Sequence, residues 1–256
     1  MKLDHIVHFI HENPSRAANL FQLLGFHSVK GGQHEQWGTA NSLSYFDLTY
    51  LEFLAIEDAE KAAQSENPLV RLCLNRASKK GGICQMAFRT ENIEKLAEYL
   101  QEQGFHIQGL FPGSRKRADG KRVEWKMLFA ENPEAEGQLP FFIQWEQTDE
   151  ERRIDLIETG AILEHSNGVS RMIEAGYVTE DPAGLLKKWQ RWYGLEKVKH
   201  ENKLYAGDQM IAFIKPSEME EAEKAFQENG AGPFYVSFSE KDRKLPKEFL
   251  EGVYFF

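Results

Sequence analysis

The chain has 256 residues, of which 41% are hydrophobic and 28% charged, which is enough for one large globular domain or two modest ones. Its formal net charge of −9 opposes nucleic-acid binding, which needs a basic surface to displace counterions from phosphates. The two cysteines cannot form a disulfide framework, and we find neither a signal peptide nor an apolar run of membrane-spanning length, so we expect a cytoplasmic protein that does not bind membranes.

The first predicted element is an apolar strand at residues 3–10 that contains a histidine, His5. Asn13 and Pro14 then predict the start of a helix, because they are a favourable N-cap and a favourable first-turn residue. Apolar residues at helical spacing follow until Gly25, where the helix is predicted to end. Further strands are predicted at residues 26–29, 42–46 and 50–56, so the unit is β-α-β-β-β.

The next part of the chain repeats this unit. Gly25-Phe26-His27 recurs 79 residues later as Gly104-Phe105-His106 (104 − 25 = 79), and the same offset places residues 3–9 on residues 82–88. A second helix is predicted before Gly104, and strands follow it at residues 105–108, 123–129 and 141–145. The sequence therefore predicts a second β-α-β-β-β module.

A third copy is predicted from residue 169 onward, with Asp181 and Pro182 opening its helix and Gly194 closing it. The fourth copy is reduced, because only residues 234–238 and 253–256 are predicted as strands, corresponding to the first and last strands of a module. The polar stretch at residues 147–153 is the best boundary. We therefore predict two domains, residues 1–148 and 149–256, the second one degenerate.

Paired β-α-β-β-β modules, L-D-H at residues 3–5 and Y-L-E-F-L-A at residues 50–55 resemble the vicinal oxygen chelate superfamily, which includes glyoxalase I, extradiol dioxygenases, fosfomycin-resistance proteins and bleomycin-binding proteins. Three segments resemble uncharacterised bacterial glyoxalase-like domain proteins: G-G-Q-H-E-Q-W-G-T-A-N-S-L (31–43), P-F-F-I-Q-W (140–145) and H-S-N-G (165–168). The resemblance implies an α+β fold in which tandem βαβββ modules pair into two half-barrels and the last module is truncated.

The resemblance also implies a metal held by the first and fourth strands, where this chain has His5 and Glu52. Imidazole and carboxylate together suit Fe, Mn, Ni, Co or Zn with positions left open for substrate. The second module departs from the pattern, because Cys84 falls where a second histidine is expected and Phe142 where a second glutamate is expected. A purely structural role for His5 stays open, whereas a buried Glu52 is costly unless it is paired or metal-bound.

Two further groups of residues are candidates for the site. His34 is either a third metal ligand beside a polar wall made by Trp37, Thr39 and Asn41, or part of an ordered turn. The basic stretch at residues 114–122, predicted as a hairpin with an Asp119-Gly120 turn, is either a solvated loop or a device that draws an anionic ligand to the cavity. The residues of this second group that we expect to contact the ligand are Arg115, Arg117, Arg122 and, lining the cavity, Trp125 and Phe142.

Two functions follow from these candidates. One is a divalent-metal-dependent lyase, isomerase or dioxygenase that acts on an oxygenated or anionic small molecule, with Glu52 as the catalytic residue. The other is a metal-free protein that binds or sequesters a small molecule. Its 18 Phe, 8 Tyr and 5 Trp residues could supply the apolar contact surface for such a ligand. The presence of His5 with Glu52 favours the enzyme, and the missing ligands of the second module favour the binding protein. We expect a monomer or a homodimer.

Overall fold

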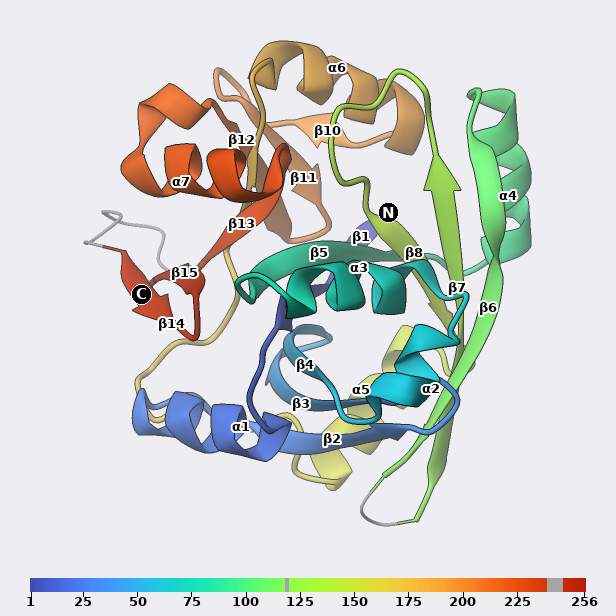
Figure 1. Ribbon diagram of the computed structural model, residues 1–256, viewed down its shortest axis with the longest axis vertical. Coiled ribbons are helices and arrows are strands. Elements are labelled where there is room, and N and C mark those ends of the chain that lie inside the picture. The colour runs from blue at the N-terminus through green and yellow to red at the C-terminus, as the bar shows by residue number, and fades with distance from the viewer. Residues whose placement is uncertain (118–119, 239–245) are drawn as a thin grey trace.

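The computed structural model describes residues 1–117, 120–238 and 246–256 (Figure 1). The first module contains β1 (Lys2–Phe9), α1 (Pro14–Leu23), β2 (Val29–His34), β3 (Thr39–Phe46) and β4 (Thr49–Ile56). Helices α2 (Ala59–Ala63) and α3 (Pro68–Ala77) lead to the second module, which contains β5 (Gly82–Arg89), α4 (Ile93–Glu102), β6 (His106–Lys116), β7 (Arg122–Glu131) and β8 (Phe141–Trp145). Both modules therefore have the predicted order of elements.

The strands of these two modules form a closed barrel in the order β1-β4-β3-β2-β6-β7-β8-β5. The register of β2 against β6 consists of one pair, Gln33 opposite Lys116, and this pair closes what would otherwise be an open half-barrel. Helix α3 lies across the middle of the barrel (Figure 1), and its Leu69 and Cys73 pack in the same core cluster as Val7 and Phe9. The inside of the barrel is thus filled by side chains from the strands and from α3.

The local signals of the first helix are confirmed. The Asn13 side chain accepts a hydrogen bond from the backbone N–H of Ser15, and Pro14 is the first helical residue. After the helix, Gly25 has a φ of 86°, a left-handed conformation that glycine adopts without a steric penalty. The helix consequently ends where the sequence predicts.

Two β-bulges shape the centre of the barrel, where β1 and β5 run antiparallel. Leu3 pairs with Phe88 and His5 with Ala87, so Asp4 is an extra residue on β1. In the same way Val7 pairs with Gln85 and His8 with Ile83, so Cys84 is an extra residue on β5. The two bulges are related by an offset of 80 residues (84 − 4 = 80), one more than the offset of the helices.

This register corrects the alignment of the two modules. With an offset of 80, the counterpart of His5 is Gln85, whereas Cys84 corresponds to Asp4. Because Val7 lies beside Glu52, and its counterpart Ala87 lies beside Phe141, the counterpart of Glu52 is Phe141. Phe142 is one residue further along β8, so its side chain points to the opposite face and packs in the core outside the barrel.

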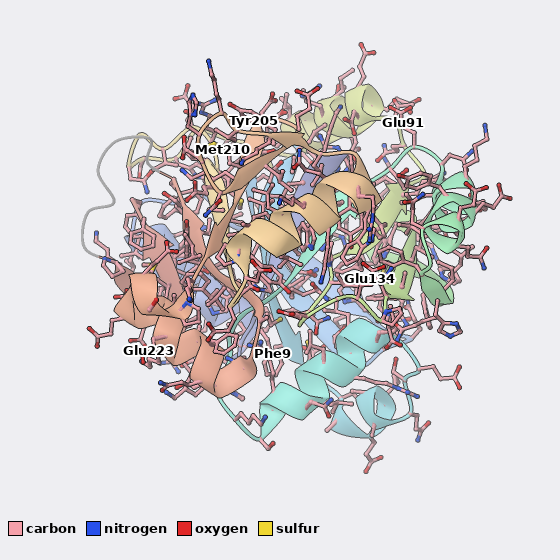
Figure 2. All side chains as sticks on the ribbon, turned by 90° about the horizontal axis from the view of Figure 1, so that it is seen from above. Phe9, Glu91, Glu134, Tyr205, Met210 and Glu223 are labelled. Carbon is pink, nitrogen blue, oxygen red and sulfur yellow. The ribbon has the colours of Figure 1, made fainter. Side chains whose placement is uncertain are left out.

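The second half of the chain forms an open sheet. Helix α5 (Asp149–Glu158) precedes the third module, which contains β9 (Glu174–Val178), α6 (Pro182–Tyr193), β10 (Glu196–Lys197), β11 (Lys203–Ala206) and β12 (Gln209–Ile214). The 3₁₀ helix η1 (Pro216–Glu218) and α7 (Glu220–Asn229) lead to β13 (Gly232–Ser237), β14 (Lys247–Phe249) and β15 (Gly252–Phe255). Among the described residues the strand order is β10-β11-β12-β9-β13-β15-β14. Figure 2 shows Tyr205 and Met210, which face each other across β11 and β12.

The fourth module is short, as predicted, but contains β14 in addition to the two expected strands. β15 runs parallel to β13, as β4 runs parallel to β1, so it is the last strand of its module. β13 also has a bulge like that of β5. Gly176 pairs with Tyr235 and Tyr177 with Pro233, so Phe234 is the extra residue and corresponds to Cys84.

The two halves share one core, and α5 packs on the barrel. A single cluster of buried apolar residues joins Leu3 and Phe88 of the barrel to Trp189 and Trp192 of α6. Leu156 of α5 packs in a separate cluster with residues of β3 and β4. The division into domains between residues 148 and 149 stays a prediction. Although α5 follows this boundary in the sequence, it packs against the barrel. Among the described residues, no helix is long and apolar enough to cross a membrane.

Candidate functional site

A small cavity inside the barrel brings most of the predicted site residues together. Its walls come from β1, β2, β3, β4, β6, β7, β8, the start of α3 and the residue before that helix, and its free volume is about 30 Å³. Of the residues that line it, all except Trp37 and Trp145 are buried. The predicted site residues that line it are His5, His34, Trp37, Thr39, Asn41, Glu52, Arg115 and Trp125.

His5 and Glu52 face each other in this cavity. The Nε2 atom of His5 lies 3.6 Å from Oε2 of Glu52, and the imidazole ring stacks on Tyr50 at a centroid distance of 4.5 Å. On the other side of the ring, Nδ1 of His5 lies 2.7 Å from Oδ1 of Asp4. This second contact exists because the bulge in β1 turns Asp4 toward the same side as His5, although neighbouring strand residues normally point to opposite faces.

Asp4 is held as a carboxylate by its surroundings. Burial alone would raise its pKa, but Arg152, His5 and Arg89 outweigh burial and lower the pKa to about 2. Oδ2 of Asp4 accepts hydrogen bonds from Trp145 at 3.0 Å and from Arg152 at 3.3 Å. A permanently charged acceptor at Nδ1 keeps the proton of a neutral His5 on that nitrogen, so the lone pair of Nε2 faces Glu52.

Asn41 connects Glu52 to the opposite wall of the cavity. Its Nδ2 donates to Oε1 of Glu52 at 2.5 Å and lies 3.4 Å from Nε2 of His34, while its Oδ1 accepts from Arg115 at 3.5 Å. Gly31 packs directly against this group, because a Cβ atom there would lie 1.9 Å from Oδ1 of Asn41 and 2.9 Å from a nitrogen of Arg115. The first glycine of the G-G-Q-H segment is therefore required by the packing of the site.

Arg115 is the one residue of the basic stretch that lines the cavity, among the residues that the structure describes. Its guanidinium is buried, with contacts of 3.5 Å to Asn41 and to the Tyr45 hydroxyl. Arg117 instead pairs with Asp155 of α5 at 2.5 Å, and Arg122 is exposed and pairs with Glu124 at 2.8 Å. Asp119 of the predicted turn lies outside the described residues.

The profile of the glyoxalase-like domain matches residues 3–193, which include the whole barrel and α6. The chain belongs to the glyoxalase-like domain family. A crystal structure of a hypothetical protein from Staphylococcus aureus shares this fold: it aligns over 99% of this chain and 97% of that one, at 20% identity and a TM-score of 0.75. A Streptomyces coelicolor methylmalonyl-CoA epimerase, in complex with 2-nitronate-propionyl-CoA, aligns over 57% of this chain and 99% of that one, at 17% identity and a TM-score of 0.43. No curated protein matches the sequence.

Membership of the glyoxalase-like domain family confirms the resemblance drawn from the sequence, and the donor set can now be tested for a metal. His5 and Glu52 are close enough to bind one ion together. His34 lies behind Asn41, and its Nδ1 is 2.9 Å from the Thr39 hydroxyl. In the parts of the chain that the structure describes, no three His, Cys, Asp or Glu side chains converge as a metal site.

The charges around the cavity also oppose a tightly held divalent ion in this glyoxalase-like domain. Arg115 places a fixed cation in the same cavity, and the amide N–H of Asn41, not a free oxygen, is directed at Glu52. Burial lowers the pKa of His34 to about 4, with Arg115 contributing and Glu52 opposing, so this imidazole is neutral at pH 7 and could bind a metal, but its ring nitrogens lie against Thr39 and Asn41. The fixed cation of Arg115 and the amide N–H of Asn41 therefore fit a bound divalent ion poorly.

Among the residues that sequence reasoning missed are Tyr50, which lines the cavity, and Asp4 and Arg152, which support it from behind. Asp4 follows Leu3 in an apolar strand, and strict alternation of faces hides its role until the bulge is known. Tyr50 is recognisable only as an aromatic residue two positions before Glu52, on the same face of β4. Arg152 belongs to the predicted second domain, but it reaches the site because α5 packs on the barrel, where the guanidinium lies 4.1 Å from the centre of the Trp145 ring.

Proposed function

We propose that the cavity is an acid–base site for a small oxygenated molecule, in which Glu52 takes up a proton. The observation that carries this proposal is the pair of Nε2 of His5 and Oε2 of Glu52, 3.6 Å apart, with Asp4 bound to the other side of the imidazole. With this spacing a carboxylate and an imidazole can both act on a proton of a ligand bound between or beside them.

The step that these residues support is removal of a proton from a carbon next to a carbonyl group. The carboxylate of Glu52 forms an O–H bond as the C–H bond of the substrate breaks, and the electron pair moves onto the carbonyl oxygen to give an enolate. Arg115 is the cation in the cavity that can stabilise this oxygen. Return of the proton to another carbon or another face gives an isomerase, and loss of a leaving group gives a lyase.

A second candidate is metal-free sequestration of a small molecule. The observation that favours it is the aromatic wall opposite the polar residues, made by Trp37, Trp125, Trp145 and Phe141. Such a wall supplies a large contact area without any chemistry. In this case Glu52 would be a hydrogen-bond acceptor for the ligand.

Hydrogen–deuterium exchange separates the two functions. Pyruvate, hydroxyacetone and 3-phenylpyruvate are incubated with the untagged protein in D₂O, and loss of the carbon-bound proton is followed by NMR. We expect exchange in the wild type, a loss of about 10²-fold or more in Glu52→Gln, and no change in Glu60→Gln, which alters an exposed glutamate on α2. Unchanged exchange in Glu52→Gln contradicts the proposal, and binding without exchange supports sequestration.

Metal content is measured on the same untagged samples. The acid–base site as proposed needs no bound ion, so exchange should survive treatment with a chelator. About one equivalent of a transition metal in the wild type, lost in both His5→Ala and Glu52→Gln, would instead support the metal-dependent enzyme that the superfamily resemblance implies.

A further inference from the structure

We propose that the ligand of this cavity is a short carboxylic acid whose carboxylate binds between Arg115 and the amino end of α3. This inference deepens the proposed acid–base function, because it names the substrate class. It rests on three observations: the unfulfilled hydrogen-bonding capacity of Arg115, the position of the α3 N-terminus, and the order of groups along the polar wall.

Arg115 is buried with too few partners. Its side chain is 7% exposed, and its Nε has no hydrogen-bond partner among the described residues. The contacts that it does make, to Asn41 and Tyr45, are 3.5 Å long, at the outer limit of a hydrogen bond. A buried guanidinium is costly unless its donors are used, and a carboxylate can accept two of them side by side.

The amino end of α3 lies at the same cavity. Leu69 and Val70, from the first turn of this ten-residue helix, line the cavity together with the N-cap residue Asn67. The Asn67 side chain caps the helix by accepting from the N–H of Leu69. The positive end of a helix dipole favours an anion nearby, so the helix adds to the attraction of Arg115.

The carboxylates already present do not neutralise Arg115. Asp4 is paired with Arg152, and Asn41 lies between Arg115 and Glu52, with its Oδ1 toward the first and its Nδ2 toward the second. The free volume of about 30 Å³ is small, so the cavity as it stands favours a short ligand. One guanidinium matches the single charge of a carboxylate better than the double charge of a phosphate.

The order of Arg115, Asn41 and Glu52 along the polar wall of the cavity also limits which ligand atom can lie next to Glu52. Arg115 binds one end of the ligand, and Glu52 lies beyond Asn41 on the same wall. The atom presented to Glu52 is therefore close to the carboxylate. The class that fits is a 2-hydroxy or 2-oxo acid with a short apolar side chain that packs on Trp125 and Phe141.

The test compares acids with their neutral amides. Lactate and 2-hydroxybutyrate are titrated against lactamide and 2-hydroxybutyramide by calorimetry and by tryptophan fluorescence, since Trp37, Trp125 and Trp145 line the cavity. We expect at least one acid to bind at least tenfold more tightly than its amide. Equal binding of acid and amide, or no binding of either acid at 50 mM, overturns the inference.

Variants then assign the effect to Arg115. We expect Arg115→Gln to lose the preference for the acid and Arg115→Lys to keep part of it, whereas Arg122→Gln, on the same hairpin but exposed, leaves it unchanged. If Arg115→Gln does not fold, the comparison of acid and amide binding in the wild type still tests whether the cavity prefers a carboxylate. Glu52→Gln separates this inference from the proposed function, because it should bind the acids and lose only proton exchange.

Discussion

Asp4 determines which nitrogen of His5 faces Glu52, and this makes it a positioning residue. In Asp4→Asn the amide can present either a donor or an acceptor to Nδ1, so the imidazole loses its fixed tautomer. We expect proton exchange to fall at least tenfold and its pH profile to shift. The matched control is Asp47→Asn, which breaks the exposed ion pair with Arg153 and should leave exchange unchanged.

The same variant should also unfold more easily. Arg152 is 3% exposed and loses its carboxylate partner in Asp4→Asn, so a buried charge is left unpaired. Removing one partner of a buried ion pair typically costs about 3 kcal/mol of the free energy of unfolding. Urea unfolding measures this cost, and a stability equal to that of Asp47→Asn would contradict our assignment of the Asp4 and Arg152 pair.

Gly31 is a second residue whose replacement tests the site. In Gly31→Ala the new methyl group overlaps Oδ1 of Asn41 and must displace Asn41, Arg115 or both. Overpacking of this kind costs about 1–3 kcal/mol, and we expect acid binding to weaken more than stability does. Gly232→Ala is the control, because the nearest atom to its added methyl group is 3.6 Å away. Tight acid binding by Gly31→Ala would mean that Asn41 and Arg115 are not placed by this contact.

The first turn of helix α3 forms part of the cavity wall, and its N-cap residue, Asn67, can be replaced. Asn67→Ala should cost about 1 kcal/mol of stability, since an N-cap hydrogen bond is lost. The matched change is Asn92→Ala, which removes the same kind of cap from α4, where Asn92 accepts from the N–H of Lys95. We expect similar losses of thermal stability from both variants, but faster amide exchange in α3 and altered acid binding only from Asn67→Ala.

The elements show where sequence patterns suffice and where they do not. Module order and the cap at Asn13 follow from local chemistry and periodicity, and the structure has them. The placement of His5 and Glu52 on the first and fourth strands, which pair in the structure, came from the family resemblance. A bulge is different, because it inserts one residue without a compositional signal, and the alignment of Cys84 with His5 was wrong for that reason. Contacts such as that of Arg152 with Asp4 join residues 148 positions apart and depend on how α5 packs.

At the scale of the whole molecule, His8 links the barrel to the C-terminal segment. Its Nδ1 lies 2.5 Å from the Tyr254 hydroxyl and its Nε2 lies 2.7 Å from the Leu250 carbonyl. Burial lowers the pKa of His8 from 6.5 to about 4, against the opposing effect of that carbonyl. The neutral imidazole is therefore the form that the folded protein favours.

Acid should weaken this link. Between pH 6.5 and 4 the unfolded chain binds a proton at position 8 and the folded chain does not, so stability falls as the pH is lowered, by about 1.4 kcal/mol per pH unit for this group. Melting temperatures across this range should fall less steeply in His8→Gln. The slope should not vanish, because the pKa of His34 is lowered in the same way. An identical slope in the wild type and His8→Gln would contradict the assignment.

The extra residue on β5 and its counterpart on β13 show that the two sheets are built alike. Cys84 and Phe234 stand at equivalent places in two sheets whose neighbouring residue pairs correspond one for one. By the same register Glu174 stands at the position of His5, and Tyr235 donates a hydrogen bond to it. The second sheet therefore repeats the strand pairing of the barrel but places a carboxylate where the barrel has its imidazole.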